Sequence, residues 1–287
     1  MRVFECVPNV SEGRDAAIVD ACARAIEDAG ATLAHRTSDA VHHRSVFTFF
    51  GERDVVLAAA LALARVACER IDLREHRGAH PRIGALDVLP FVPFGSATAE
   101  DAVALARESA EHLWATLRVP SYLYADAATS DERRLLANVR AGGFEGLRAR
   151  ADRPDVGDEP HERAGAVAVG ARAPLVAFNV VLATGDVHLA RAIARRLRER
   201  DGGLRTVRAL GIRLADDRVQ VSCNLTDPAA VPLHRVLEIV RSLAARAGVN
   251  VAGSELIGLV PRDALAALVA HRFGFEVRPR EAENSDA

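Results

Sequence analysis

The chain has 287 residues, enough for one large domain or two smaller ones. Its 37 basic and 39 acidic residues give a formal net charge of −2, which argues against a surface that binds nucleic acid or an anionic membrane. Every basic residue is an arginine. Schiff-base chemistry, attachment of pyridoxal phosphate and a P-loop nucleotide site are therefore excluded, because each needs a lysine.

The cysteines and the N-terminus predict a cytoplasmic protein. Cys6, Cys22, Cys68 and Cys223 are widely separated and form no C-x-x-C pair, which favours a reducing compartment. The chain begins without an apolar signal core, and no window approaches eighteen consecutive apolar residues. We therefore expect a soluble, cytoplasmic chain that does not enter a membrane.

The first third of the chain predicts a unit of alternating strands and helices. Apolar periodicity and enrichment in β-branched or aromatic residues distinguish the two kinds of element. The predicted elements are a strand at 2–7, a helix at 14–28, strands at 31–36 and 45–50, a helix at 53–71 and a strand at 88–94. This βαββαβ order is that of a ferredoxin-like unit.

The same order recurs near the end of the chain. The second set is a strand at 175–183, a helix at 186–200, strands at 206–214 and 218–224, a helix at 232–247 and a strand at 249–253. Between the two sets we predict a helix at 99–117, a strand at 121–124, a helix at 131–138 and a polar linker at 148–162. The fold class is therefore predicted as α+β, with two ferredoxin-like subdomains and mixed or antiparallel sheets.

Histidines are concentrated in the first unit, where five lie between residues 34 and 87. Histidine exchanges protons near neutral pH, so this region is the candidate site. In the segment 76–84, two glycines and a proline constrain the backbone, which would hold His80 and Arg82 in defined directions. We interpret His80 as an acid–base residue and His76 as a cation at a helix C-terminus.

The same histidines do not predict a metal site. His42 and His43 are adjacent and would point apart in a strand, and Gly78 interrupts the spacing between His76 and His80. No H-E-x-x-H pattern is present. We therefore expect no metal.

Three other places could contact a substrate. The segment 8–14 turns from a strand into a helix, with Ser11 as a candidate N-cap, and its amides could receive an anion or could simply start the helix. Arg44 could bind a carboxylate through two hydrogen bonds or be a solvated surface charge. Asn179 and Asn224 interrupt apolar strands and could be structural amides or face a cleft.

Several segments, spread in order over nearly the whole chain, resemble the glutamate formimidoyltransferase family. They are ECVPNVSEGR at 5–14, HPRIGALDV at 80–88, FNV at 178–180, QVS at 220–222, NLT at 224–226 and GLVP at 258–261. Together they are far more specific than any one of them. The resemblance is to the transferase part alone, without the cyclodeaminase domain that some members carry.

The resemblance implies transfer of a formimidoyl group from N-formimidoyl-L-glutamate to N5 of tetrahydrofolate, giving L-glutamate and 5-formimidoyltetrahydrofolate in histidine degradation. It also implies a homodimer with tetrahydrofolate as co-substrate, no metal, and a groove between the two subdomains. We accordingly expect an N-terminal subdomain at 1–155 with the catalytic loop, a folate-contact junction at 156–174 and a C-terminal subdomain at 175–287.

The resemblance places the family's catalytic histidine on His80. Its folate-binding segment falls near Gly157, Pro160, His161 and Gly165. The residues expected to contact substrate are Asn9, Ser11, Asp39, His42, Arg44, Arg82 and Asn179. Asp39 or Asp87 could orient the imidazole of His80, as a carboxylate partner does in other acid–base pairs.

The chemistry suits a histidine. N5 of tetrahydrofolate must lose a proton as it attacks the amidine carbon, and a neutral imidazole near its reference pKa can accept that proton. The tetrahedral centre then expels the amine of glutamate, which needs a proton in return. One histidine can therefore serve as base and then as acid.

The chain differs from common residues of the family at Val41, where an acid is usual, at His43 and Val181, where asparagine is common, and at Asp126, where glutamate is common. Two alternatives therefore remain open. One is formyl transfer between 5-formyltetrahydrofolate and glutamate, because formyl and formimidoyl groups differ only by O against NH. The other is a folate-binding protein of the same fold that does not catalyse transfer.

Overall fold

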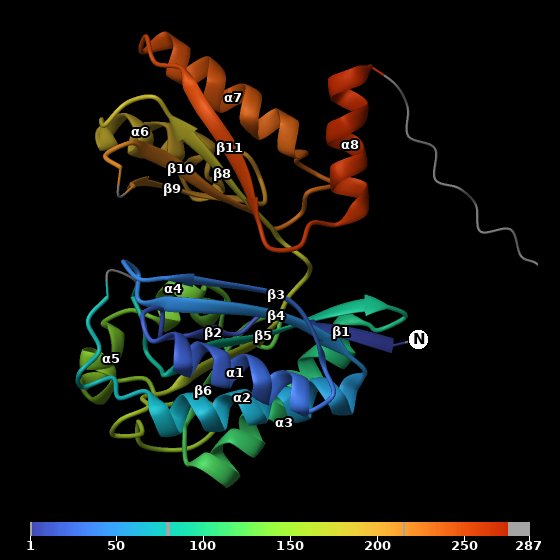
Figure 1. Cartoon of the computed structure of the whole chain (residues 1–287), viewed down its shortest axis with the longest axis vertical. Helices are drawn as coiled ribbons and strands as arrows, with labels where there is room; N and C mark the ends of the chain where they lie inside the picture. Colours follow the sequence, from blue (N-terminus) through green and yellow to red (C-terminus); the bar gives the residue numbers. More distant parts are fainter. Residues whose placement is uncertain (1, 79–80, 215, 275–287) are drawn as a thin grey trace, which may run out of the picture. The chain divides into compact units, whose positions relative to one another are not determined.

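The computed structural model describes residues 2–78, 81–214 and 216–274, and the chain forms two units, with the boundary in the sequence between Ala173 and Pro174 (Figure 1). Each unit has its own β-sheet and its own hydrophobic core. This arrangement confirms the predicted α+β class with two units.

The sheet of the first unit combines antiparallel and parallel strands. Its strands are β1 (Arg2–Cys6), β2 (Asn9–Val10), β3 (Thr32–Asp39), β4 (Arg44–Gly51), β5 (Leu86–Gly95), β6 (Ser121–Ala125) and β7 (Val167–Ala171). Four positions of the sheet are antiparallel, in the order β3, β4, then β1 and β2, then β5. The strands β1 and β2 share one position, because both pair with β4 on one side and with β5 on the other. Beyond β5, the strands β7 and β6 extend the sheet in parallel. The antiparallel part has the strand order of a ferredoxin-like unit.

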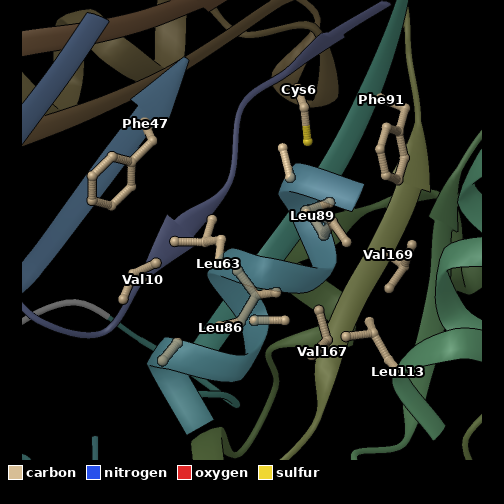
Figure 2. Packing of buried hydrophobic residues seen from close by; sticks show 14 of the residues in the cluster. Cys6, Val10, Phe47, Leu63, Leu86, Leu89, Phe91, Leu113, Val167 and Val169 are labelled. Carbon is tan, nitrogen blue, oxygen red and sulfur yellow. The ribbon is translucent and has the colours of Figure 1, made fainter. Parts of the chain in front are cut away.

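Long helices cover one face of this sheet (Figure 1). They are α1 (Ala16–Asp28), α2 (Arg53–Arg70) and α3 (Ala99–Leu117). Figure 2 shows Leu63 of α2 beside Val10 of β2 and Leu86 of β5, and each of the three has at most 1% of its surface exposed. Each such side chain contributes roughly 1.5–3 kcal/mol by leaving water. This core holds the sheet in place, and His42 and His43 lie in the turn between its strands β3 and β4.

Short helical segments lie between β6 and β7. They are the 3₁₀ turn η1 (Asp131–Arg134), α4 (Leu136–Val139), α5 (Gly143–Gly146) and the 3₁₀ turn η2 (Leu147–Ala149). The helix predicted at 131–138 is therefore wrong in detail, because Leu135 has an extended backbone (φ −99°, ψ 114°) that separates η1 from α4. Val139 and Leu147 from these segments pack with Tyr122 and Tyr124 of β6.

The second unit is a four-stranded antiparallel sheet with two helices packed on it. Its elements are β8 (Val176–Leu182), α6 (Val187–Leu197), the 3₁₀ turn η3 (Glu199–Asp201), β9 (Val207–Arg213), β10 (Val219–Leu225), α7 (Leu233–Arg246), β11 (Val251–Ile257) and α8 (Arg262–Phe273). The sheet order β11-β8-β10-β9 is that of a ferredoxin-like unit. Its core contains the apolar side chains of β8 and β10 on the side that faces α6 and α7.

Some elements differ from the prediction. The structure adds β2, β7 and α8, and β7 lies inside the segment expected as a junction, where it pairs with β5 and β6. Helix α1 begins at Ala16, later than predicted, with Asp15 as its N-cap. In the described residues, none of the helices is long and apolar enough to cross a membrane.

Candidate active site

The candidate site of the first unit is formed by the turn after β2, the turn between β3 and β4, the segment between α2 and β5, and α5. His80 and Ala79 lie outside the described residues. On either side of them, Gly78 approaches the backbone of the β3–β4 turn closely and Arg82 is bound to α5.

Arg82 makes contacts in two directions. Its Nη1 and Nη2 donate to the two carboxylate oxygens of Glu145 in α5, at 3.0 and 2.8 Å. Its Nε donates to Nδ1 of His76 at 2.9 Å, and Nη2 also donates to the His76 carbonyl at 3.1 Å. Four of the five N–H donors of the guanidinium are thus used inside the protein. This favours a structural role for Arg82 over the expected binding of a substrate carboxylate.

His76 is buried, with 5% of its surface exposed. Its Nε2 lies 3.0 Å from the carbonyl oxygen of His43, and its ring stacks on the His43 ring with centroids 4.2 Å apart. Helix α2 ends at Arg70, six positions earlier. The interpretation of His76 as a cation at a helix C-terminus is therefore wrong, because the residue lies beyond the helix and packs against the β3–β4 turn.

Glu12 organises the turn that follows β2. One oxygen of its buried carboxylate accepts hydrogen bonds from the backbone N–H groups of Gly13, Arg14 and Asp15, at 2.9, 2.7 and 2.9 Å. The same oxygen lies 3.3 Å from Nδ1 of His43. The sequence left open whether these amides receive an anion or simply start the helix, and in the structure they bind an anion of the protein itself, the Glu12 carboxylate.

His43 joins this turn to the β3–β4 turn. Its Nδ1 accepts a hydrogen bond from the Gly13 N–H at 3.1 Å, and its backbone is left-handed, with φ 51°. Burial lowers the pKa of His43, and Arg14 and Arg82 lower it further, while Glu12 opposes them.

Ser11 and Asn9 have local partners. The Ser11 hydroxyl donates to the Gly84 carbonyl at 2.7 Å, and only 2% of the residue is exposed. Ser11 is therefore not the N-cap of α1, because Asp15 accepts the first helical amides instead. The Asn9 side chain donates to the Val7 carbonyl at 3.2 Å, beside the same strand ends.

Asp39 and His42 form a carboxylate–imidazole pair at the β3–β4 turn. Asp39 Oδ2 lies 2.6 Å from His42 Nδ1, and Oδ1 accepts from the backbone N–H groups of Val41 and His42. Burial opposes ionisation of Asp39, but these hydrogen bonds outweigh it and lower its pKa. The carboxylate is thus held as an anion beside an imidazole, and its expected relation to His80 lies outside the described residues.

Arg44, at the start of β4, lies in an environment shared by Arg140, Asp87 and Asp39. Burial lowers its pKa, and repulsion from Arg140 adds to this, while the two carboxylates oppose the shift. Both carboxylate oxygens of Asp87 already accept hydrogen bonds, Oδ1 from the Ile83 N–H at 2.7 Å and Oδ2 from Arg140 Nε at 2.9 Å. Two guanidinium groups therefore share this corner of the sheet, an arrangement that suits a carboxylate ligand.

The expected folate segment adopts a tight structure of its own. His161 and Gly165 exchange backbone hydrogen bonds of 2.9 and 2.8 Å, and His161 Nδ1 accepts from the Ala164 N–H at 3.0 Å. Gly157 has φ +88°, and a Cβ there would lie 2.6 Å from the Trp114 ring. Pro160 lies between them and is partly exposed. Gly157 is thus required by local packing, whatever else the segment binds.

In the second unit, Asn179 of β8 is buried and its Nδ2 donates to Glu255 of β11 at 3.0 Å. Asn224, also singled out in the sequence, is exposed on β10. Sequence reasoning missed Glu12, Arg140 and Glu145. An acid directly before Gly-Arg at a helix start could have signalled Glu12. In the described part of the chain, no group of three His, Cys, Asp or Glu side chains is arranged to hold a metal ion.

Comparisons with known proteins match most of the chain. Residues 3–172 match the family model "Formiminotransferase domain, N-terminal subdomain", and residues 177–278 match "Formiminotransferase domain". A glutamate formimidoyltransferase of Streptococcus pyogenes is 44% identical over 92% of this chain and 91% of its own. One from Thermoplasma acidophilum is 41% identical over 92% and 90%. The formimidoyltransferase-cyclodeaminase of Gallus gallus is 40% identical, but the match covers 51% of its length.

Proposed function

Because this chain belongs to the formiminotransferase family, we propose that it is a transferase that moves the formimidoyl group of N-formimidoyl-L-glutamate to N5 of tetrahydrofolate. The products are L-glutamate and 5-formimidoyltetrahydrofolate, a step of histidine degradation. The observation that carries this proposal is 44% identity, over nine-tenths of both chains, to a protein named glutamate formimidoyltransferase.

In this proposal His80 is the general base and acid. The imidazole takes the proton of N5 as the nitrogen attacks the amidine carbon, so a C–N bond forms and a tetrahedral centre results. The bond from that carbon to the glutamate nitrogen then breaks, and the imidazolium returns its proton to the leaving amine. No net proton is gained or lost by the enzyme, and no redox step occurs.

The described surroundings supply groups for the two substrates. Arg44 beside Arg140 suits a carboxylate of the glutamate derivative, and the anionic Asp39 with His42 suits the cationic amidine. Asn9 offers an amide group of the first unit as a further contact. We also propose Asn179, in the second unit, as a substrate contact. We assign the segment with Gly157, Pro160, His161 and Gly165 to the folate side, with tetrahydrofolate as a co-substrate and no metal.

The proposal also includes the cellular compartment, the oligomeric state and the domain division of the enzyme. We assign it to the cytoplasm, where histidine degradation takes place, as a homodimer that acts on small molecules rather than on nucleic acid or membranes. The domain division is proposed as a catalytic N-terminal part at 1–155, a junction at 156–174 and a C-terminal part at 175–287.

An absorbance assay tests the proposal. Purified protein is mixed with tetrahydrofolate and N-formimidoyl-L-glutamate, beside the variants His80→Ala and His80→Gln and beside His112→Gln, an exposed histidine of α3. We expect formation of 5-formimidoyltetrahydrofolate by the wild type and His112→Gln, and loss of roughly 10²–10⁴-fold in both His80 variants. Tetrahydrofolate binding measured by fluorescence should persist in all four proteins.

The donor is tested in the same experiment. Turnover with N-formylglutamate in place of the formimidoyl donor would indicate formyl transfer. Folate binding without turnover of either donor would indicate a non-catalytic binding protein, and the exposed Val41 in the β3–β4 turn would then be the first residue to restore to an acid.

A further inference from the structure

We propose that His76 is a positioning residue, which as a neutral imidazole with its proton on Nε2 links the β3–β4 turn to Arg82 and so fixes the chain on both sides of residues 79 and 80. Its effect on catalysis rests on the proposed function, in which His80 is the acid–base residue. The link itself does not depend on that function, because it follows from the hydrogen-bond partners of the ring.

The partners of the His76 ring specify one protonation state. The carbonyl oxygen of His43 can only accept, so Nε2, 3.0 Å away, must donate. Arg82 Nε can only donate, so Nδ1, 2.9 Å away, must accept. The Nδ1–H tautomer would place two N–H groups against each other and leave the carbonyl facing a lone pair. The imidazolium would keep the bond to His43 but lose the bond to Arg82.

The charges around the ring favour the same state. Arg82 touches Nδ1, Arg77 donates to the His76 carbonyl at 2.8 Å, and His43 covers one face of the ring. The carboxylate of Glu12 lies 3.3 Å from His43 Nδ1, and the positive charge of Arg14 also acts on His43. Burial lowers the pKa of His76, and the neighbouring His43 and Arg82 lower it further, against the opposing effects of the His43 carbonyl and Glu12.

The segment around His76 is anchored at both ends. At Gly78 the backbone approaches the β3–β4 turn so closely that a Cβ would lie 2.6 Å from the His42 carbonyl oxygen. At Arg82 the backbone carbonyl accepts from the Phe144 N–H at 2.8 Å, and the side chain pairs with Glu145. The bond between His76 and Arg82 joins these two anchors across six residues. Removing the acceptor at Nδ1 would therefore weaken this link and leave the bond from Arg82 Nη2 to the His76 carbonyl as the connection between the two residues.

The direct test is a long-range ¹H–¹⁵N correlation on protein labelled with ¹⁵N-histidine, with the His76 signal assigned by its absence from the His76→Gln spectrum. At pH 7 we expect a neutral ring with the proton on Nε2, and a titration midpoint below the ordinary value of about 6.5 for a histidine. A ring protonated on Nδ1, or one charged at pH 7, would overturn the proposal.

The kinetic test uses variants that keep different parts of the link. In His76→Gln an amide can still donate to the His43 carbonyl, but the acceptor for Arg82 is lost. In His76→Asn an oxygen can still accept from Arg82. We expect kcat of His76→Gln to fall about 10- to 100-fold with KM nearly unchanged, because small misplacement of reacting groups has such effects. His76→Asn should retain more activity, and His112→Gln should match the wild type.

The two proposals fail in different ways. Wild-type protein that shows the Nε2–H tautomer but no transfer would contradict the proposed function and leave the link in place. Active wild-type protein whose His76→Gln variant has unchanged kcat at every pH would contradict the positioning role. If His76→Gln does not fold, the spectrum of His76→Asn assigns the His76 signal of the wild type instead, and that signal and the activity of His76→Asn still decide the outcome.

Discussion

Asp87 and Arg140 form a buried ion pair that joins the start of β5 to the residue after α4. Arg140 donates through Nε and Nη2 to the same carboxylate oxygen of Asp87, while the other oxygen accepts from the Ile83 N–H. Only 1% of Asp87 is exposed. A buried charge that loses its partner is expensive, so this pair holds the segment around Ile83 against β5 and α4.

Replacing Asp87 by asparagine should be strongly destabilising. The buried guanidinium of Arg140 would lose its counter-charge, at a cost of about 3–5 kcal/mol in the free energy of unfolding. Urea unfolding followed by circular dichroism measures this, with Asp131→Asn as the control, because Asp131 is fully exposed and its pair with Arg134 lies at the surface. Equal stability of the two variants would show that the Asp87 pair contributes nothing.

Glu12→Gln should weaken the turn that leads from β2 into α1. The glutamine oxygen can still accept from the amides of residues 13–15, but without the charge that strengthens all three bonds. We expect a loss of about 1.5–3 kcal/mol in the free energy of unfolding, the range for hydrogen bonds to charged groups. Glu27→Gln, an exposed position on α1, is the control, and a thermal melt that falls equally in both variants would contradict the role of Glu12.

Gly13→Ala should disturb the β3–β4 turn. A Cβ at Gly13 would lie 2.3 Å from the Asp39 carbonyl oxygen and 2.6 Å from the Arg44 nitrogen, both of which are backbone atoms that cannot move aside easily. Such overpacking costs roughly 1–3 kcal/mol. Gly146→Ala, where no atom lies within 4 Å of the new Cβ, should be neutral. The contrast between the two melting temperatures tests the close approach.

Much of the fold could be predicted because its signals are local. The alternation of apolar residues in β8 and β10, and the period of α2 and α7, depend on neighbouring residues alone. Strand β7 is different, since its sequence VAVGA has weak strand propensity and it becomes a strand by pairing in parallel with β5 and β6. Such non-local pairing leaves no periodic signal in the sequence.

In the candidate site, too, features that depend on neighbouring residues could be predicted, and contacts between distant residues could not. The clustering of histidines and the constrained segment around Arg82 are visible in the sequence, and the structure brings His43 and His76 into contact. The partner of Arg82 is Glu145, 63 positions later, and the partner of Asp87 is Arg140, 53 positions later. A single sequence gives no reason to pair these residues, so the expected ligand role of Arg82 could not be weighed against an internal one.

The stability of the protein should fall as the pH is lowered from 6.5 toward 5. Burial lowers the pKa values of His43 and His76 below the ordinary value of 6.5, so the unfolded chain binds more protons than the folded chain in this range. The free energy of unfolding therefore rises with pH there, and it reaches its full value above pH 6.5. Each such histidine adds at most about 1.4 kcal/mol per pH unit to the slope.

Urea unfolding at a series of pH values between 5 and 7.5 measures this slope. In this pH range Asp39 and Glu145 do not contribute to the slope. Their pKa values are lowered from reference values that are already acidic, so they affect stability only at lower pH. His161 and His234 also have lowered pKa values, so the slope of the wild type alone does not identify His76. The difference in slope between the wild type and His76→Gln does identify His76, because glutamine does not titrate. We expect a shallower slope in the variant, and parallel curves would mean that His76 is not held neutral in the folded chain.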